Sequence, residues 1–255
     1  MSLGCELATG DLKDPPQIQA ACEGISAVIS TASSTLSRQP GDSIESVDLQ
    51  GQLTLVNAAK SAGVRRFVFV SFRDDPTVQY PLTQAKRSVE HAIADFDFTS
   101  IQASYFMEVW LSPAVGFDYM NARARVYGGG LRPISWVSYR DVAEFCIAPA
   151  LRSVGACGVL RVGGPEALTP LEVVKIFEEE SGRRFEVEVI SEVSLREQFD
   201  STNDSLEKSF AGLMLQYAHG DAVEMRELLE SFPLRLTSVR EHARAALQKT
   251  TAERA

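Results

Sequence analysis

The sequence contains few of the residues that bind metals or form disulfides. Its 255 residues include four cysteines and three histidines. No two cysteines stand in a CxxC pair, and no two histidines have the spacing of a ligand pair on a helix. We therefore expect no metal site, and we expect reduced thiols at Cys5, Cys22, Cys146 and Cys157.

Basic residues and long apolar runs are also scarce. Lysine and arginine number 25 against 34 aspartate and glutamate residues, which gives a formal net charge of -9. Nucleic acids and anionic membranes bind clustered basic side chains, so this balance argues against both as partners. No apolar run reaches the roughly 18 residues of a membrane span, and no secretory signal pattern opens the chain. We expect a cytoplasmic protein that binds a small-molecule substrate or another protein.

Apolar runs alternate with amphipathic helical patterns through most of the chain. Short runs at residues 27–34, 65–72 and 96–104 are typical of parallel strands that helices cover on both faces. Helical patterns lie between them, one ending near Gly63 and another beginning with Pro81 at its first position. This alternation predicts an α/β protein with a doubly wound, Rossmann-like parallel sheet.

The remaining third is predicted to be a small α+β lobe. Thr169, Glu172 and Gly182 supply a capping box and a stop signal around a helix. Residues 184–190 alternate as a strand does, and the chain is charged and helical in pattern from about residue 194. We therefore predict a nucleotide-binding domain of residues 1–164. A C-terminal lobe of residues 165–255, mostly helical, follows it.

Two predicted strand ends carry candidate binding residues. Asp11 and Leu12 follow the first expected strand, and Thr31, Ala32 and Ser33 end the next one. The carboxyl ends of strands line the ligand crevice of an open α/β sheet, and small side chains let a ribose or phosphate approach the backbone. An ordinary capped loop uses the same residue types. These positions alone therefore leave both interpretations open.

Several segments also occur in the order and spacing of a known family. They are "GDL", "AVISTASS", "NAAKSAGVRRFVFVSF", "PLTQAKRSVEHAI", "SYFMEVW", "RPISWVSYRDVAEF" and "PLRLTSVREHA". Together they resemble the NmrA-like branch of the atypical short-chain dehydrogenases, over a span from Cys5 to about Arg244. The resemblance implies a domain that binds NADP or NAD, with Asp11 and Leu12 beside the adenine and residues 31–33 near the nicotinamide ribose.

The family's first strand, GxxGxxG turn and second strand have no counterpart in this sequence. Met1 stands where the family's third strand begins, so the resemblance implies an N-terminally truncated sheet. Those glycines hold the pyrophosphate at a helix N-terminus. Gly128, Gly129 and Gly130 lead into a strand and do not replace them. We therefore expect weak or absent cofactor binding by this chain.

The general acid of conventional short-chain dehydrogenases is missing as well. That acid is a tyrosine four residues before a lysine, since residues i and i+4 share a helix face. Lys86 is present, but Leu82 stands at the tyrosine position and Tyr80 is turned off that face. The resemblance assigns Lys86 to the nicotinamide ribose and Ser71 to the nicotinamide, as the two candidate catalytic residues. The alternatives are a solvated lysine and a serine that caps a turn.

The segment "SYFMEVW" is the candidate substrate pocket. It contains Tyr105, Phe106, Met107 and Glu108, and in the family this segment lines the substrate site. Aromatic side chains with one carboxylate suit a mostly apolar ligand. A core patch between the sheet and the C-terminal lobe would have the same composition. Asp141, by contrast, fits a structural position at a helix N-terminus.

Three functional hypotheses follow. The first is an NAD(P)H-dependent reductase of small apolar carbonyl or quinone compounds. The second is a non-catalytic protein that senses NAD(P) or binds a partner, which the missing tyrosine favours. The third is a truncated form that binds no cofactor. Strand order adds a structural expectation: residues 5–9 either pair with residues 27–32 or stay detached and leave an open sheet edge.

Overall fold

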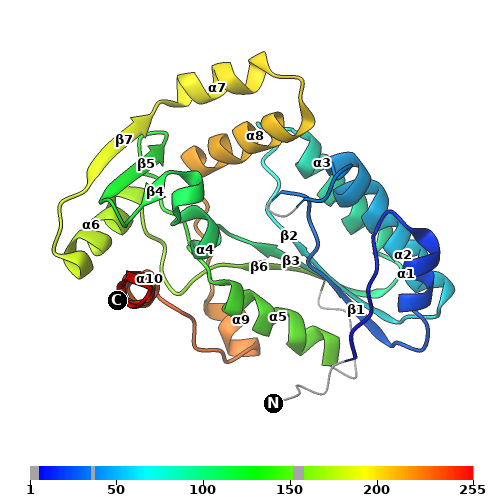
Figure 1. Ribbon diagram of the computed structural model, residues 1–255. Helices are drawn as coiled ribbons and strands as arrows, with labels where there is room; N and C mark the ends of the chain where they lie inside the picture. Colours follow the sequence, from blue (N-terminus) through cyan, green and yellow to red (C-terminus); the bar gives the residue numbers. More distant parts are fainter. Residues whose placement is uncertain (1–5, 36–37, 152–157, 255) are drawn as a thin grey trace.

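A parallel four-stranded sheet forms the centre of the molecule (Figure 1). Each strand pairs in parallel with the next one, which confirms the predicted α/β class. The strands are β1 (Ala27–Ser30), β2 (Arg66–Ser71), β3 (Asp97–Ala103) and β6 (Gly158–Val162), in the order β1-β2-β3-β6. The computed structural model describes residues 6–35, 38–151 and 158–254.

Helices cover both faces of this sheet, as the doubly wound prediction requires. Phe67 and Phe69 of β2 pack under the helices of one face, while Val68 packs under those of the other. Successive residues of a strand point to opposite faces, so β2 is apolar throughout because both of its faces are buried. The helices are α1 (Pro15–Ala21), α2 (Gln52–Ser61) and α3 (Pro81–Ala92) on the first face, and α5 (Tyr139–Leu151) and α9 (Arg226–Ser231) on the second.

A three-stranded sheet forms the smaller lobe. β5 (Arg123–Tyr127) pairs antiparallel with β4 (Phe117–Asp118) and parallel with β7 (Glu186–Ile190). The predicted boundary after residue 164 does not separate the two sheets, because β4 and β5 precede it in the sequence. The lobe also contains α4 (Met107–Trp110), the 3-10 turn η2 (Pro113–Val115), α6 (Pro170–Ser181), α7 (Glu192–Ser201), α8 (Ser205–His219) and α10 (Val239–Arg254).

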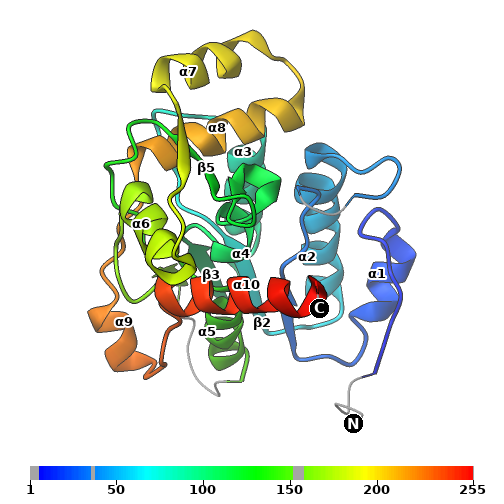
Figure 2. The same cartoon turned by 60° about the vertical axis from the view of Figure 1, so that its left-hand side comes forward.

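Helix α10 lies against α6 (Figure 2). Val239 and Ala243 are buried in this contact. Arg240 and Arg244 both bind the carboxylate of Glu180, at 2.5 and 2.7 Å. Buried apolar side chains and flanking ion pairs therefore hold the last helix against α6.

The predicted first strand is not found in the described part of the chain. Cys5 lies outside the described residues, and residues 6–10 form no strand. Leu7 is 95% exposed, so this segment buries no large apolar side chain that would hold it against the sheet. Among the described strands, β1 pairs with β2 alone. The detached alternative therefore holds for residues 6–9.

The helix predicted between residues 44 and 63 has a different start. It opens as a π-helical segment, η1 (Ile44–Gly51), and continues as α2. Gly51 allows a close approach of the chain before α1, since a Cβ there would lie 2.8 Å from Cβ of Leu12. Such π-helical segments occur frequently at functional sites. This one carries Asp48, whose contacts are described below with the site.

The local start and stop signals are confirmed. Backbone N of Glu172 donates to Oγ1 of Thr169, and the Glu172 carboxylate accepts from backbone N of Thr169 in return. Gly182 and Gly63 follow their helices with φ of 67° and 73°, the left-handed region that favours glycine. Pro81 is the first residue of α3. Each signal depends on contacts within a few residues, so tertiary packing does not override it.

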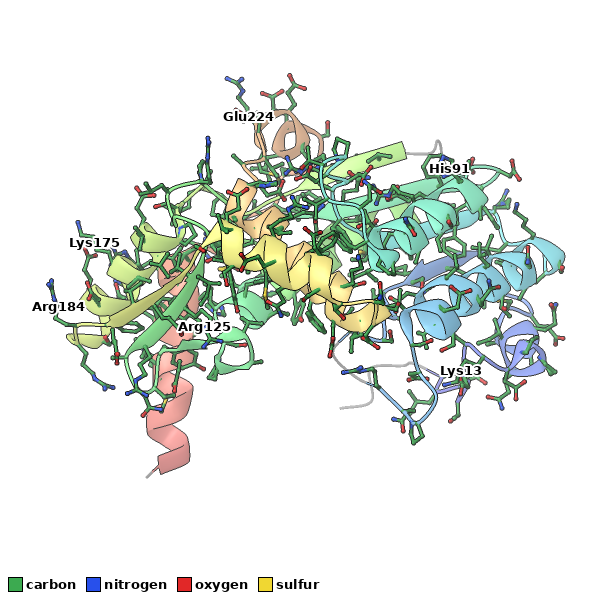
Figure 3. The ribbon with its side chains drawn as sticks, turned by 90° about the horizontal axis from the view of Figure 1, so that it is seen from above. Lys13, His91, Arg125, Lys175, Arg184 and Glu224 are labelled. Carbon is green, nitrogen blue, oxygen red and sulfur yellow. The ribbon has the colours of Figure 1, made fainter. Side chains whose placement is uncertain are left out.

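Charged side chains occupy the outside of the molecule. Figure 3 shows Lys13, Lys175, Arg184 and Glu224 at its periphery. Within the described residues, no helix is long and apolar enough to cross a lipid bilayer. The same residues contain no group of three or more histidine, cysteine, aspartate or glutamate side chains that could hold a metal ion.

Candidate functional site

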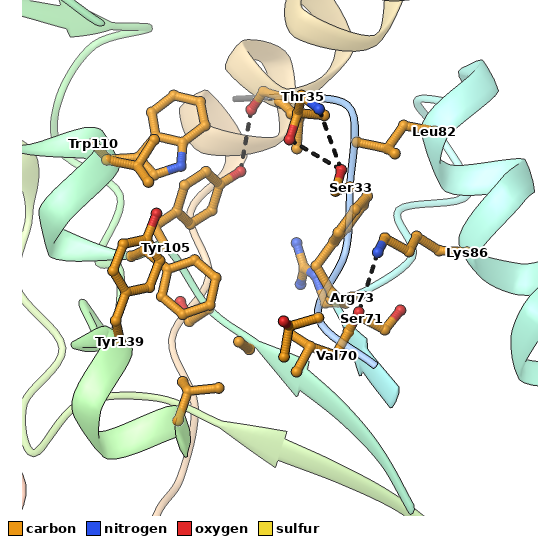
Figure 4. A pocket seen from close by; sticks show the side chains of 18 of the residues that line it. Ser33, Thr35, Val70, Ser71, Arg73, Leu82, Lys86, Tyr105, Trp110 and Tyr139 are labelled. Atoms are coloured by element: carbon orange, nitrogen blue, oxygen red, sulfur yellow. Dashed lines mark hydrogen bonds between the residues drawn. The ribbon is translucent and has the colours of Figure 1, made fainter. Parts of the chain in front are cut away.

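A cavity of about 600 Å³ opens at the carboxyl ends of β1, β2 and β3 (Figure 4). The loops after these strands form one wall, and α4, α5 and α8 contribute the others. Ligands of open α/β sheets bind at the carboxyl ends of the strands, and pockets for small molecules have about this volume. The lining is predominantly apolar, with a few polar side chains at the strand ends.

Buried polar side chains hold the loop after β1 in place. Asp48 is completely buried, and its Oδ2 accepts hydrogen bonds from backbone N and Oγ of Ser34, at 3.0 and 2.7 Å. Nε2 of Gln52 donates to the carbonyl of Ala32 at 2.9 Å. Side chains of η1 and α2 thus hold residues 31–35 by hydrogen bonds. The backbone conformation of this loop is therefore set before any ligand binds.

Lys86 reaches the cavity from α3. Its Nζ donates to the carbonyl of Val70 at 3.1 Å and lies 4.7 Å from the ring centroid of Phe69. Burial lowers the pKa of this ammonium, and the negative charges of Asp48 and Glu90 act in the opposite direction. An ammonium has three protons, so the single bond to Val70 leaves donors for a ligand among the described contacts.

Ser71 ends β2 beside this lysine. Its hydroxyl oxygen accepts a hydrogen bond of 2.7 Å from Nη2 of Arg87. The same nitrogen donates to the carbonyl of Phe72 at 2.8 Å and to the carboxylate of Glu90 at 3.0 Å. The serine is therefore oriented by a fixed guanidinium, and its own hydroxyl proton remains available as a donor.

No phenol occupies the position of the conventional acid. Leu82 lines the cavity at that point of α3. Tyr80 is buried away from the cavity lining, and its hydroxyl donates to Oε1 of Gln216. Burial raises the pKa of Tyr80, which makes the phenol a still weaker acid. The expectation that Tyr80 does not replace the missing acid is thus consistent with its position.

Packed aromatic rings form the wall opposite Lys86 (Figure 4). The hydroxyl of Tyr105 donates to the carbonyl of Leu213 at 3.1 Å. Its ring meets that of Trp110 edge to face, with centroids 4.9 Å apart. Tyr217 contacts both rings from behind, at centroid distances of 5.6 and 5.5 Å. These mutual contacts fix the orientation of each ring, so the wall presents a rigid aromatic surface to a ligand.

The comparison with protein families decides the ancestry of this chain. The sequence model of the NmrA-like family matches residues 1–242. The chain belongs to the NmrA-like family. This match confirms the resemblance that the seven quoted sequence segments indicated.

Relatives of this NmrA-like protein include both an assembly factor and reductases. The photosystem II assembly factor Ycf39 of a Synechocystis strain is 30% identical over 202 residues, which cover 76% of this chain and 59% of that protein. An NAD(P)H azoreductase of Xenophilus azovorans is 25% identical over 71% of this chain and 60% of its own length. The chain thus spans less than two thirds of the length of these relatives.

Solved structures share the fold. An NADPH-dependent quinone oxidoreductase of Escherichia coli, complexed with NADPH, superposes with a TM-score of 0.76 at 18% identity. The match covers 96% of this chain and 84% of that chain. At this identity the likeness shows the fold alone.

The cavity brings together part of the predicted site. Thr31, Ser33, Ser71, Lys86, Tyr105 and Phe106 all line it, although β2, β3 and the helical segments η1, α2 and α3 lie between the first and the last of them in the sequence. Asp11, Leu12, Ala32, Met107 and Glu108 are not among the lining residues.

The residues outside the cavity have other contacts. Asp11 is exposed in a turn where its Oδ1 accepts from backbone N of Lys13, and Leu12 packs beside Gly51, so their assignment to the adenine stays a prediction. The pocket assignment is corrected for Met107, which is completely buried in the core. It is corrected also for Glu108, whose Oε2 accepts from backbone N of Tyr139.

The sequence analysis missed several residues of this NmrA-like cavity. Tyr139 is the first residue of α5, and its ring lines the cavity and packs on Phe106 with centroids 4.6 Å apart. Arg73 lies two residues beyond Ser71, and its side chain also lines the cavity. The sequence did contain a signal for Arg73. Residues just after the end of a parallel strand lie at the same edge of the sheet as the strand end, and Arg73 follows Ser71 closely.

Proposed function

We propose that this NmrA-like protein is an NAD(P)H-dependent reductase of small, mostly apolar carbonyl compounds, of which quinones fit best. The observation that carries the proposal is the cavity at the strand ends. There a buried ammonium and an oriented serine face a wall of packed aromatic rings. Donors on one side and rigid aromatic rings on the other suit a nicotinamide ring that lies beside an aromatic acceptor.

The residues at this end of the cavity fit a nicotinamide cofactor, NADP or NAD, which supplies a hydride when it is bound. Lys86 would donate to a ribose hydroxyl, since its ammonium is buried and keeps unused protons. Ser71 would donate to the acceptor or the nicotinamide amide. The aromatic wall would position the acceptor and exclude water. Residues 6–35 present no glycine-rich turn before a helix, so this segment offers little to a pyrophosphate.

The leucine at position 82 favours quinones over simple ketones. Hydride addition to a ketone produces an alkoxide, a strong base that requires a positioned acid. Hydride addition to a quinone produces a phenolate, and phenols have a pKa of about 10, so water can supply the proton without help. A cavity that holds Leu82 where the acid would stand supports the second reaction.

A second candidate is a non-catalytic NAD(P)-sensing or interaction protein. The same leucine supports it, because a chain that only binds a cofactor needs no acid. The sequence similarity to a photosystem II assembly factor also supports this second candidate. The reductase and the NAD(P) sensor differ in turnover and not in cofactor binding.

The test combines binding with turnover. NADPH binding is measured by fluorescence titration, and oxidation of NADPH is then followed with a naphthoquinone and with a matched aryl ketone. Reduction of the quinone at a higher rate than the ketone is expected. NADPH binding without turnover of either compound would favour the second candidate. A chain that folds but binds no NADPH at any concentration would refute both the reductase and the NAD(P) sensor.

A further inference from the structure

A second cationic side chain, besides Lys86, lies in the predominantly apolar cavity. Arg73 follows β2, lines the cavity, and points its guanidinium into the space between Tyr105 and Lys86 (Figure 4). Its side chain is 38% exposed. Ligand pockets are mainly apolar, and the few charged groups they contain fix the orientation of the ligand.

The guanidinium is held from one side only. Its Nε lies 3.5 Å from Oδ1 of Asp221, and its Nη2 donates to the carbonyl of Gly220 at 3.2 Å. A guanidinium carries five N–H donors in a rigid plane. Among the described residues, no acceptor contacts Nη1, so this edge of the plane is available to a ligand.

Asp221 does not neutralise this charge by itself. The same carboxylate oxygen lies 2.6 Å from Nη2 of Arg161, a residue of β6 that does not line the cavity. Two guanidinium groups therefore share one carboxylate, and the cluster keeps one net positive charge. Asp221 is also the sole acidic residue among the described lining residues. A positive charge in an apolar cavity attracts an anion more strongly than the same charge in water.

We propose that the cavity binds planar aromatic compounds that carry an acidic group, with Arg73 as the residue that binds the acid. The rings of Tyr105, Trp110 and Tyr139 would cover the aromatic part. A carboxylate, sulfonate or phenolate would receive N–H bonds from the free edge of the guanidinium. That such a compound is reduced in the cavity rests on the proposed reductase function, but that it binds there does not. A neutral ligand would leave the free N–H groups of Arg73 covered and without an acceptor.

The test uses two fluorescent probes that differ in the acidic group alone. They are anilinonaphthalene sulfonate and N-phenylnaphthylamine, the same rings without the sulfonate. The wild-type chain, without NADPH, is expected to bind the sulfonate about tenfold more tightly than the neutral amine. This preference should shrink as salt is added. Quenching of Trp110, judged against Trp110→Phe, shows that each probe occupies the cavity.

Arg73→Met should remove the preference without weakening the binding of the neutral amine. Arg125→Met is the matched control: it alters the net charge equally but lies on β5, where Arg125 pairs with Glu188. It should keep the preference. Arg73→Gln serves if the methionine variant melts early, because the amide can still donate to the Gly220 carbonyl.

Equal wild-type affinity for both probes would overturn the proposal, and so would a preference that survives in the Arg73 variants. Neither result depends on NADPH. A failure here therefore leaves the reductase proposal standing, while an absence of NADPH binding leaves the role of Arg73 standing.

Discussion

Replacement of Lys86 by methionine separates its role in binding from its role in the fold. Methionine keeps the length of the buried stem and removes the ammonium. A hydrogen bond from a charged donor contributes about 1.5–3 kcal/mol, so NADPH affinity should fall roughly 10- to 150-fold. Fluorescence titration of both forms gives this ratio even where absolute affinity is low.

Stability should respond differently. Burial lowers the pKa of Lys86 from its ordinary value of 10.5, which means that the folded state holds this proton less well than the unfolded chain does. The charged lysine therefore costs stability at neutral pH. This cost fades as pH rises from the lowered folded pKa toward 10.5, where the unfolded chain also loses its proton. Lys86→Met should thus melt no lower than wild type at pH 7, and its relative advantage should shrink at alkaline pH.

Leu82→Met is the control for this prediction, since it lies one turn earlier on α3 and lines the same cavity without losing a donor. It should bind NADPH as wild type does. An equal loss of affinity in the two variants would refute the role given to the ammonium, and unchanged affinity in Lys86→Met would do the same.

Three further substitutions test the packing around the site. Thr169→Ala removes the cap of α6 and should lower the free energy of unfolding by about 1 kcal/mol in denaturant melts, with NADPH affinity unchanged. Gly212→Ala would place a Cβ 2.3 Å from Cδ1 of Tyr80, so overpacking should cost about 1–3 kcal/mol and lower the melting temperature. Tyr80→Phe leaves the buried Oε1 of Gln216 without its donor, which should cost about 1–3 kcal/mol but leave quinone turnover unchanged. A large loss of turnover in that last variant would make Tyr80 part of the chemistry.

The sequence predicted those parts of the site that depend on local pattern. Thr31, Ser33 and Ser71 were found because each follows an apolar run, and the ends of parallel strands meet at one edge of a sheet. Lys86 was found through the resemblance to the NmrA-like family, and Pro81 at the first helical position predicted the helix that carries it. Such signals need only the period of a strand or a helix, and the capping box of α6 belongs to the same class.

The same reasoning failed where packing decides. Met107 and Glu108 follow a strand end as Phe106 does, but α4 begins at Met107 and turns that side chain into the core. The segment at residues 6–9 has the composition of a strand, yet it lacks a neighbour strand among the described residues. Period and composition do not say which side of a helix will be covered or which strand lies next to which.

The charged part of the cavity depends on contacts between residues more than a hundred positions apart. Helix α8 and the residues after it contact α3 and the segment that connects β2 to α3. Ser209 accepts from backbone N of Leu82 through its Oγ, and His219 Nδ1 lies 2.8 Å from the carboxylate of Asp75. Beyond these contacts, the carbonyl of Gly220 holds Arg73. Docking of α8 therefore both closes the apolar wall and fixes the cation, so the selectivity proposed for Arg73 requires the smaller lobe in place.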